Sequence, residues 1–299
     1  MNLLVTGALG CSDAQKNMLK ALSENFVFLQ NESDTLPCDY ESIDTVVCNG
    51  LFLHHPIDKF KKLKNIQLTS AGLDRVDCDY VLKKGININN ARGVYSVPMA
   101  EFAVFGVLEL YKKGFAFYKN KEKRLWEKQR DLIELSGKVV SVVGCGSVGQ
   151  ECAKRFSAFG CKVLGVDINC EKNALFEKIY PIGELDDVLK ISDVVILTLP
   201  LTESTTHLFN AQKFAAMKDN SVLVNISRGA VVDTKAMIVA LKNKLFGAVL
   251  DVFEQEPLDA TSELWELDNT IITPHNSFVG ENNNQRLFNT VYKFLKELV

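Results

Sequence analysis

The sequence predicts an α/β protein made of two domains, each built on a doubly wound parallel sheet. Short apolar runs alternate with helical stretches, and this alternation occurs in two successive segments, the second with longer runs. Strands that alternate with helices form parallel sheets whose two faces are covered by those helices. A chain of 299 residues is long enough for two domains of ordinary size.

The first segment contains five apolar runs that are typical of strands, at residues 3–6, 26–29, 45–48, 66–68 and 86–89. Ser12 or Asp13 is expected to cap a helix that runs to about residue 23, because a side-chain oxygen there accepts a bond from the free amides of the first turn. Residues 284–299 have apolar side chains at helical spacing, so a last helix is expected to cross back to this domain. The predicted first domain is residues 1–96 plus 280–299.

The second domain, residues 97–279, contains almost continuous apolar runs, as expected of strands buried on both faces. These predicted strands are residues 139–143, 163–166, 194–199, 222–226, 248–252 and 270–272. Asp233 is expected to cap a helix at residues 234–242. Residues 98–118 fit one helix, which is expected to join the two domains.

Composition and charge exclude several classes of protein. Hydrophobic residues make up 47% of the chain and charged residues 24%, a balance typical of globular proteins, and the net charge is −3. No nucleic-acid partner is expected, because the lysine-rich run at 119–130 is interrupted by Glu122 and Glu127. The longest apolar runs are far shorter than a membrane span requires.

The cysteines and the first residues predict a reduced compartment. The eight cysteines include no C-x-x-C pair, and Cys48 and Cys152 are examples that lie in apolar stretches, which suit buried free thiols. The opening residues do not resemble an export signal. A cytoplasmic protein without a metal site is therefore expected.

A glycine motif follows the first strand of the second domain. Gly144, Gly146 and Gly149 form the pattern G-x-G-x-x-G directly after the apolar run at 139–143, and a helical stretch follows. The first glycine allows a tight turn, the second lets the backbone approach a pyrophosphate, and the third lets helix and strand pack closely. The free amides at the start of the helix favour phosphate groups. The motif therefore predicts a dinucleotide-binding site.

Asp167 predicts which dinucleotide binds. It ends the next predicted strand, 23 residues after Gly144, close to the roughly 20-residue spacing expected of the acid that binds ribose hydroxyls. A carboxylate there repels the 2′-phosphate of NADP, and no arginine follows to reverse that preference. The expected cofactor is NAD.

Arg228, Glu256 and His275 each follow one of three successive predicted strands. Doubly wound sheets bind ligands just beyond the carboxyl ends of their strands. Reduction of a 2-keto acid by hydride needs a cation for the carboxylate, an acid for the developing alkoxide and a group that holds this acid in its charged form. The three residues supply these functions, and together they predict an oxidoreductase.

Three other histidines compete with His275 for the acid–base role. His54 and His55 fall in a loop of the first domain. His207 follows a strand but has no matching glutamate in the motif, so a structural turn is expected for it.

Together these segments are similar to the D-isomer-specific 2-hydroxyacid dehydrogenase family over nearly the whole chain. The matching segments are 71–77 (AGLDRVD), 100–101 (AE), 135–138 (LSGK), the glycine motif, 200–202 (PLT) with Thr205, 225–229 (NISRG), 250–257 (LDVFEQEP) and 273–275 (TPH). The resemblance implies a flavodoxin-like substrate domain and a Rossmann NAD-binding domain, with the active site in the cleft between them. It also implies a homodimer that acts on a small D-2-hydroxy acid or the corresponding 2-keto acid.

The resemblance further implies the role of each site residue. Arg228 would bind the substrate carboxylate, His275 would be the general acid and base, and Glu256 would hydrogen-bond His275 and favour its charged form. The backbone at Ala71 and Gly72 would bind the substrate from the other domain. The implied cofactor-binding residues are Gly144, Gly146, Ser147, Val148, Gly149, Asp167, Leu199, Pro200, Thr205, Ile226, Arg228 and Asp251, the last facing the nicotinamide carboxamide.

The identity of the substrate stays open at this level. A phosphorylated acid such as 3-phosphoglycerate would need extra cations in the first domain, for which Arg75 and Arg92 are candidates. Arg92 and Tyr95 either shape the substrate pocket or pack the hinge. The alternative from another class is a non-enzymatic NAD sensor or corepressor, against which the complete catalytic triad argues.

Overall fold

The computed structural model describes residues 1–299, which divide into two compact units. Unit 1 is Met1–Tyr95 with Gly280–Val299, and unit 2 is Ser96–Val279. Each unit contains one sheet in which all paired strands are parallel. The prediction of an α/β protein with two doubly wound parallel sheets is confirmed.

The sheet of unit 1 has five strands in the order β2-β1-β3-β4-β5. The strands are β1 (Asn2–Thr6), β2 (Asn25–Leu29), β3 (Thr45–Cys48), β4 (Asn65–Leu68) and β5 (Asn87–Asn89). Helices α1 (Asp13–Lys20) and α2 (Cys78–Lys84) connect strands, and the Ser12 hydroxyl caps α1 by accepting a bond from the amide of Gln15. The strand order reverses between β1 and β3, the point at which such sheets bind ligands.

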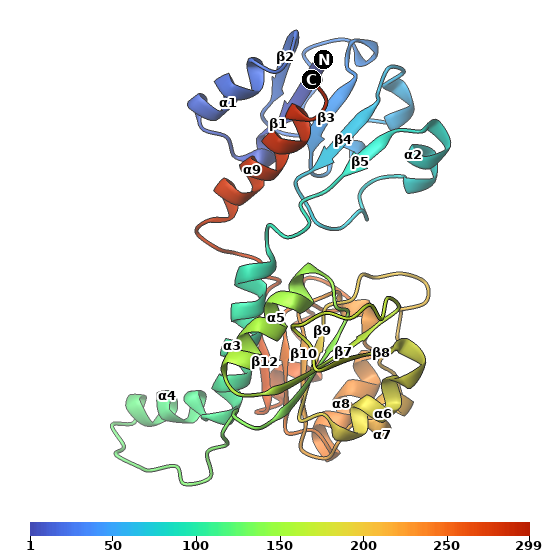
Figure 1. The fold of residues 1–299 in the computed structure, drawn as a ribbon. Helices are drawn as coiled ribbons and strands as arrows, with labels where there is room; N and C mark the ends of the chain where they lie inside the picture. The colour runs from blue at the N-terminus through green and yellow to red at the C-terminus, as the bar shows by residue number, and fades with distance from the viewer. The chain divides into compact units, whose positions relative to one another are not determined.

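The last helix, α9 (Asn283–Lys296), packs on the sheet of unit 1 although it is remote in sequence. Figure 1 shows α9, in red, beside the blue N-terminal strands. Leu287, Val291 and Phe294 recur at helical spacing and are buried in one cluster with Leu3 and Val5 of β1. The C-terminal helix therefore belongs to the first unit.

The sheet of unit 2 has seven strands in the order β12-β11-β10-β9-β6-β7-β8. The strands are β6 (Val139–Val143), β7 (Lys162–Asp167), β8 (Lys178–Pro181), β9 (Val194–Leu197), β10 (Val222–Asn225), β11 (Gly247–Leu250) and β12 (Thr270–Ile272). Two large apolar clusters include side chains of these strands, which explains their continuous apolar runs. The sequence pattern does not predict β8, because this edge strand has only two half-buried residues between a lysine and a proline.

The helices of unit 2 are α3 (Ser96–Tyr111), α4 (Gly114–Glu122), α5 (Ser147–Ala158), α6 (Leu185–Ile191), α7 (Ala211–Ala216) and α8 (Thr234–Asn243). The predicted single helix at 98–118 is wrong, because two helices occupy this stretch. Lys113 takes a left-handed conformation with φ of 52°, and Gly114, a poor helix former, begins α4. Figure 1 shows α4 and the loop after it extending away from the sheet of unit 2.

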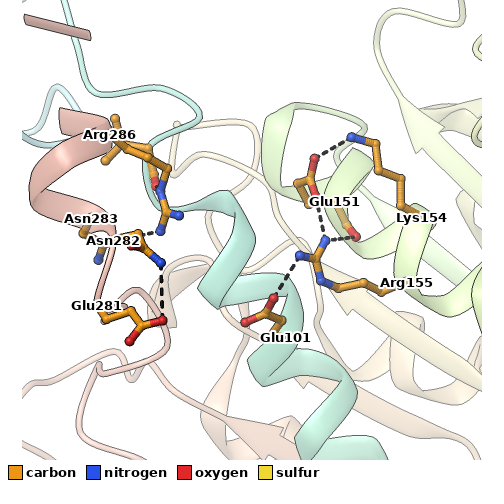
Figure 2. Close-up of polar contacts among 9 residues, drawn as sticks. Glu101, Glu151, Lys154, Arg155, Glu281, Asn282, Asn283 and Arg286 are labelled. Atoms are coloured by element: carbon orange, nitrogen blue, oxygen red, sulfur yellow. Dashed lines mark hydrogen bonds and ion pairs between the residues drawn. The ribbon is translucent and has the colours of Figure 1, made fainter. Parts of the chain in front are cut away.

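A group of ion pairs joins α3 to α5 (Figure 2). Arg155 Nη2 lies 3.1 Å from Glu101 Oε1 on α3, and Nη1 lies 2.6 Å from Glu151 Oε2 on α5. Lys154 Nζ lies 2.6 Å from the other oxygen of Glu151. Hydrogen bonds from Lys154 and Arg155 hold the pKa of Glu151 below its usual value, although burial opposes them. Such partly exposed pairs contribute at most about 1 kcal/mol each, so they help to orient the helices more than they stabilise them.

All eight cysteines are free thiols, and Cys48 and Cys152 are buried. None of the helices combines the length and the apolar character that crossing a membrane requires. No group of three or more His, Cys, Asp or Glu side chains is arranged to hold a metal ion.

Candidate active site

The loops after β10, β11 and β12 lie next to one another, because these strands are parallel neighbours in the sheet of unit 2. Arg228 lies in the loop after β10, Glu256 in the loop after β11, and His275 in the loop after β12. The three residues predicted to be catalytic therefore share one edge of the sheet. It is the carboxyl edge, where doubly wound sheets bind ligands.

His275 and Glu256 are directly hydrogen-bonded. The ring Nδ1 of His275 lies 2.8 Å from Glu256 Oε2, and the other carboxylate oxygen accepts a 3.0 Å bond from the backbone amide of Phe253. The carboxylate thereby makes Nδ1 the protonated nitrogen and orients the ring. Nε2 makes no hydrogen bond within the protein, so it can exchange a proton with a ligand. The side chains are 42% and 37% exposed, which makes the pair accessible to solutes.

Asp251, just after β11, holds the loop that contains His275. His275 has φ of 51°, a left-handed conformation that costs a non-glycine residue about 1 kcal/mol or more. Its backbone amide donates to Asp251 O at 2.8 Å. The Asp251 carboxylate accepts three more bonds from the same segment: Thr273 Oγ1 at 2.6 Å, Asn276 N at 2.7 Å and Ser277 N at 2.9 Å.

Asp251 was also predicted to face the nicotinamide carboxamide, and this stays a prediction. Asp251 is 0% exposed, and both of its carboxylate oxygens face the segment 273–277. Asp251 therefore positions His275, and the sequence could not reveal this because it depends on how the loop folds.

Asn225, the last residue of β10, shapes the loop that contains Arg228. Its Nδ2 donates to Arg228 O at 3.1 Å, and its Oδ1 accepts bonds from the amide and the hydroxyl of Ser227 at 3.1 and 2.8 Å. A Cβ at Gly229 would lie 1.8 Å from the carbonyl carbon of Phe253. The loop of Arg228 therefore packs directly on the loop that leads to Glu256. Sequence patterns assigned no role to Asn225.

The His275–Glu256 pair forms part of the wall of a cavity of about 570 Å³. The remaining lining residues are mainly apolar: Phe253, Pro257, Leu258, Trp265, Ile272, Thr273 and Pro274. A few polar groups in an apolar wall are typical of small-molecule sites. Apolar surroundings also strengthen the electrostatic interactions of a charged ring with its neighbours.

The three glycines of the motif lie between β6 and α5 and are required for different reasons. Gly144 has φ of 101°, and a Cβ there would come within about 3 Å of the backbone of Thr198 and Leu199. A Cβ at Gly149 would lie 2.1 Å from Gly144 O. The packing of the protein itself therefore requires both. A Cβ at Gly146 would meet nothing within 4 Å, so this glycine leaves open space.

The open space at Gly146 fits the pyrophosphate of a dinucleotide. Gly146 is the N-cap of α5, Ser147 and Val148 begin the helix, and no side chain caps its free amides. The start of a helix presents such amides and a partial positive charge to an anion. The residues present therefore fit a bound NAD.

Asp167 ends β7 beside the glycine motif. Its Oδ2 accepts a 2.6 Å bond from the backbone amide of Cys145, and its Oδ1 accepts a 3.0 Å bond from the amide of Asn169. Each carboxylate oxygen keeps a second lone pair with which it can accept a ligand hydroxyl. The carboxylate therefore ties the motif to β7 and remains able to bind a ribose.

The loop after β9 contains Leu199, Pro200 and Thr205. The Thr205 hydroxyl donates to Pro200 O and accepts a bond from the amide of Thr202, both at 2.8 Å, which closes the loop into a turn. Ile226, after β10, is 1% exposed, so its side chain is part of the core. The residues predicted to bind the cofactor thus lie at strand ends, in loops or at the start of α5, all near the carboxyl edge of one sheet.

In unit 1, Ala71 and Gly72 lie in the loop after β4. Ala71 O accepts a 2.8 Å bond from Asn90 Nδ2, and Gly72 O accepts a 3.0 Å bond from Ser70 Oγ. The amides of Ala71 and Gly72 donate no backbone hydrogen bond, which leaves them available to a ligand. The carbonyl oxygens therefore hold the loop in place, while the backbone amides of Ala71 and Gly72 stay available to a ligand.

Tyr95 and Arg92 differ in their surroundings. The Tyr95 hydroxyl donates a 2.6 Å bond to Thr69 O, and burial raises its pKa. Tyr95 therefore packs against the end of β4. The Arg92 side chain is exposed, and only its backbone amide is bonded, to Asn90 Oδ1 at 3.1 Å.

Comparison with known proteins decides the family. A family model described as D-isomer specific 2-hydroxyacid dehydrogenase, NAD binding domain, matches residues 104–277, more than half of the chain. The chain belongs to the D-isomer-specific 2-hydroxyacid dehydrogenase family. The family model is that of an NAD-binding domain, and the solved D-lactate dehydrogenase of Aquifex aeolicus holds NAD, so the predicted family and cofactor are confirmed.

Individual relatives of this dehydrogenase chain differ in length and in named substrate. The glyoxylate reductase of Thermofilum pendens is 37% identical over 228 aligned residues, and the match covers 73% of this chain and 67% of the relative. A D-3-phosphoglycerate dehydrogenase of Methanocaldococcus jannaschii is 35% identical over 222 residues, and the match covers 73% of this chain but 42% of the relative. The solved D-lactate dehydrogenase of Aquifex aeolicus, complexed with NAD and lactic acid, has a TM-score of 0.79 and 28% identity, covering 99% of this chain and 95% of the other.

One feature of this dehydrogenase chain was missed from the sequence, a second His–Glu pair. His207 Nε2 lies 2.5 Å from Glu254 Oε1, although no sequence motif pairs a glutamate with His207. The other oxygen of Glu254 accepts a 2.9 Å bond from the amide of Thr234. No sequence signal indicates this pair, because the two residues lie 47 positions apart in two different loops.

Proposed function

We propose that this chain is an NAD-dependent dehydrogenase that interconverts a small D-2-hydroxy acid and its 2-keto acid. The observation that supports this most is the hydrogen-bonded pair of His275 and Glu256 in a cavity wall, beside the loop of Arg228. The open space at Gly146 supports the cofactor. The similarity to a glyoxylate reductase and to a D-lactate dehydrogenase supports a small acid as substrate.

In this proposal Arg228 binds the substrate carboxylate. Its guanidinium offers two parallel N–H donors that match the two carboxylate oxygens. His275 donates a proton from Nε2 to the carbonyl oxygen during reduction and takes it back during oxidation. Glu256 orients the ring and offsets its positive charge from 2.8 Å. The bound nicotinamide supplies or accepts the hydride.

Unit 2 is the proposed NAD-binding domain and unit 1 the proposed substrate domain. Gly144, Gly146 and Gly149 shape the pyrophosphate site, and Asp167 accepts bonds from the ribose hydroxyls. The Asp167 carboxylate repels a 2′-phosphate, so NADH should be preferred over NADPH. Ala71 and Gly72 donate their free amides to the substrate.

An NADH-oxidation screen tests this function. The purified chain is assayed with glyoxylate, hydroxypyruvate, pyruvate, and branched and aromatic 2-keto acids, with NADH and NADPH in parallel. Turnover of at least one acid with a clear preference for NADH is expected. Tight NADH binding without turnover of any 2-keto acid would overturn the proposal in favour of a non-enzymatic NAD sensor.

We also propose that the chain forms a homodimer through the arm made by α4 and residues 123–137. This arm extends from unit 2 (Figure 1) and exposes several large apolar side chains: Phe115, Phe117, Tyr118, Leu125 and Trp126, the last 98% exposed. Such patches usually mark an interface, and a second copy of the same chain is the commonest partner. Light scattering after gel filtration should give the dimer mass, and Trp126→Ser should weaken the dimer. A monomeric wild type would contradict this assembly.

A further inference from the structure

Glu32 occupies a position at the edge of the unit 1 sheet where an anionic ligand would be expected. The strand order reverses between β1 and β3, and doubly wound sheets bind ligands beyond the carboxyl ends of strands at that point. The amides of Asn49 and Gly50, just after β3, donate 2.6 Å bonds to the two carboxylate oxygens of Glu32. The hydroxyl of Thr6, which ends β1, donates a further bond at 2.8 Å.

Consecutive backbone amides of this kind form a small anion-binding concavity, as in many phosphate sites. Here the anion is a side chain of the protein itself, and its segment is held in place. His55 Nε2 lies 3.0 Å from Glu32 O, and Nδ1 lies 2.9 Å from the Tyr40 hydroxyl. His55 is 5% exposed, so this support is internal. A phosphate would therefore find these amides already used.

Arg75, the first candidate cation for a phosphorylated substrate, lies beside this carboxylate. Its Nη1 donates a 2.6 Å bond to Asn49 Oδ1. A Cβ at Gly50 would lie 3.4 Å from Glu32 Oε2 and 3.7 Å from Arg75 Cδ, so both side chains flank one glycine. The negative charge of Glu32 offsets the positive charge of Arg75 at this edge. The two side chains together present no net positive charge to a phosphate.

We propose that Glu32 is a specificity-determining residue that excludes 2-keto acids with a distal phosphate and restricts the substrate to acids whose far end is uncharged. The proposal rests on the function proposed above. The loop of Ala71 and Gly72 follows β4, which pairs with β3, so the loop proposed to bind substrate adjoins the loop bonded to Glu32. A phosphate group brings a charge of about −1.5 to −2 and meets a fixed carboxylate that already uses the amides of Asn49 and Gly50.

The test compares two substrates that differ only in the phosphate, hydroxypyruvate and phosphohydroxypyruvate. In the wild type, kcat/KM should favour hydroxypyruvate by about 100-fold or more, because close like charges cost several kcal/mol. Glu32→Gln keeps the shape and removes the charge, so it should narrow this ratio by about tenfold through better use of phosphohydroxypyruvate. Glu41→Gln removes the same charge from an exposed residue of unit 1 and should leave the ratio unchanged.

Each outcome separates this proposal from the proposed function. A wild type that prefers phosphohydroxypyruvate, or an unchanged ratio in Glu32→Gln, overturns the role of Glu32 while the dehydrogenase function stands. Absence of turnover with every 2-keto acid overturns the function instead. If Glu32→Gln does not fold, product inhibition of the wild type decides: 3-phosphoglycerate should inhibit at least about tenfold more weakly than D-glycerate, and equal or stronger inhibition overturns the proposal.

Discussion

Unit 2 contains two hydrogen-bonded His–Glu pairs that share their chemistry and differ in their surroundings. Glu254 bonds to His207 at 2.5 Å, and Glu256, two residues later, bonds to His275 at 2.8 Å. Both histidines also have a left-handed backbone, with φ of 49° and 51°. The pair itself, therefore, does not identify the reactive histidine.

The other contacts of each pair make the distinction. The second oxygen of Glu254 accepts a bond from Thr234 at the start of α8, and the backbone amide of His207 donates to Ala230 O, so this pair joins two loops. His275 and Glu256 instead line the 570 Å³ cavity next to the loop of Arg228. A His–Glu pair is expected to react only where a cavity and a substrate-binding cation adjoin it.

The largest predicted effect is a difference in kcat between substitutions of the two histidines. His275→Asn is expected to lower kcat for keto-acid reduction by about 10²- to 10⁴-fold, because general acid–base catalysis contributes that much. His207→Asn, the matched control, should lower kcat by less than about threefold, since substitutions away from the reacting groups have small effects. Steady-state kinetics of the two variants measure both. Equal losses would remove the distinction between the pairs.

Arg228→Lys tests whether binding of the substrate carboxylate needs the two parallel N–H donors of a guanidinium group. Lysine keeps the charge but has no pair of parallel donors, so kcat/KM for 2-keto acids should fall by about 10- to 100-fold, the value of one or two charge-assisted hydrogen bonds. The dissociation constant of NADH, measured by fluorescence titration, should change little. A variant with near-normal kcat/KM would show that bidentate binding is not needed.

The two glutamates should differ in their effect on turnover. Glu256→Gln keeps the shape of the side chain but removes the negative charge that faces His275 Nδ1 from 2.8 Å. The kcat for keto-acid reduction should therefore fall by about tenfold or more, because this charge no longer offsets the positive charge of the ring that acts as the acid. Glu254→Gln should lower kcat by less than about threefold. Equal losses in the two variants would show that the carboxylate beside His275 has no special role in the reaction.

The parts of this site that could be predicted are those governed by the sheet. Arg228, Glu256 and His275 follow continuous apolar strands, and parallel order brings the carboxyl ends of such strands to one edge. The glycine motif is also a local signal, because the strand, the turn and the helix follow one another directly in the sequence. A pattern in which a polar residue follows an apolar strand was therefore sufficient to predict which residues lie at this edge of the sheet.

The remaining parts depend on loop conformation and could not be predicted. The Asp251 carboxylate accepts bonds from a loop more than 20 residues later, and a contact between two loops leaves no periodic pattern in the sequence. His207 is hydrogen-bonded to Glu254, which lies 47 residues later in the sequence. The break at Lys113 was missed because apolar spacing continues through it, whereas the backbone turns left-handed there.

The smallest expected effect is the contribution of the His207–Glu254 pair to the stability of the fold at acidic pH. Burial alone would raise the pKa of Glu254, but hydrogen bonds from Thr234 and His207 outweigh it and hold this pKa below its usual value. A carboxyl group with a depressed folded-state pKa stabilises the fold above its unfolded-state pKa of about 4.3, and this stabilisation is lost as the pH falls through the folded-state value. Because the side chain is 33% exposed, solvent limits the contribution to about 1 kcal/mol or less.

Glu254→Gln should therefore lower Tm by about 2 to 4 °C at pH 7 and by progressively less below about pH 4, where the wild-type carboxylate is itself protonated. Glu203→Gln, an exposed acid in the turn that leads to His207, should leave Tm unchanged at every pH. Thermal unfolding of the three proteins followed by circular dichroism between pH 3 and pH 7 measures these differences. A loss of the same size at pH 3 and pH 7 would mean that the shape of the side chain, and not its charge, joins the loop of His207 to α8.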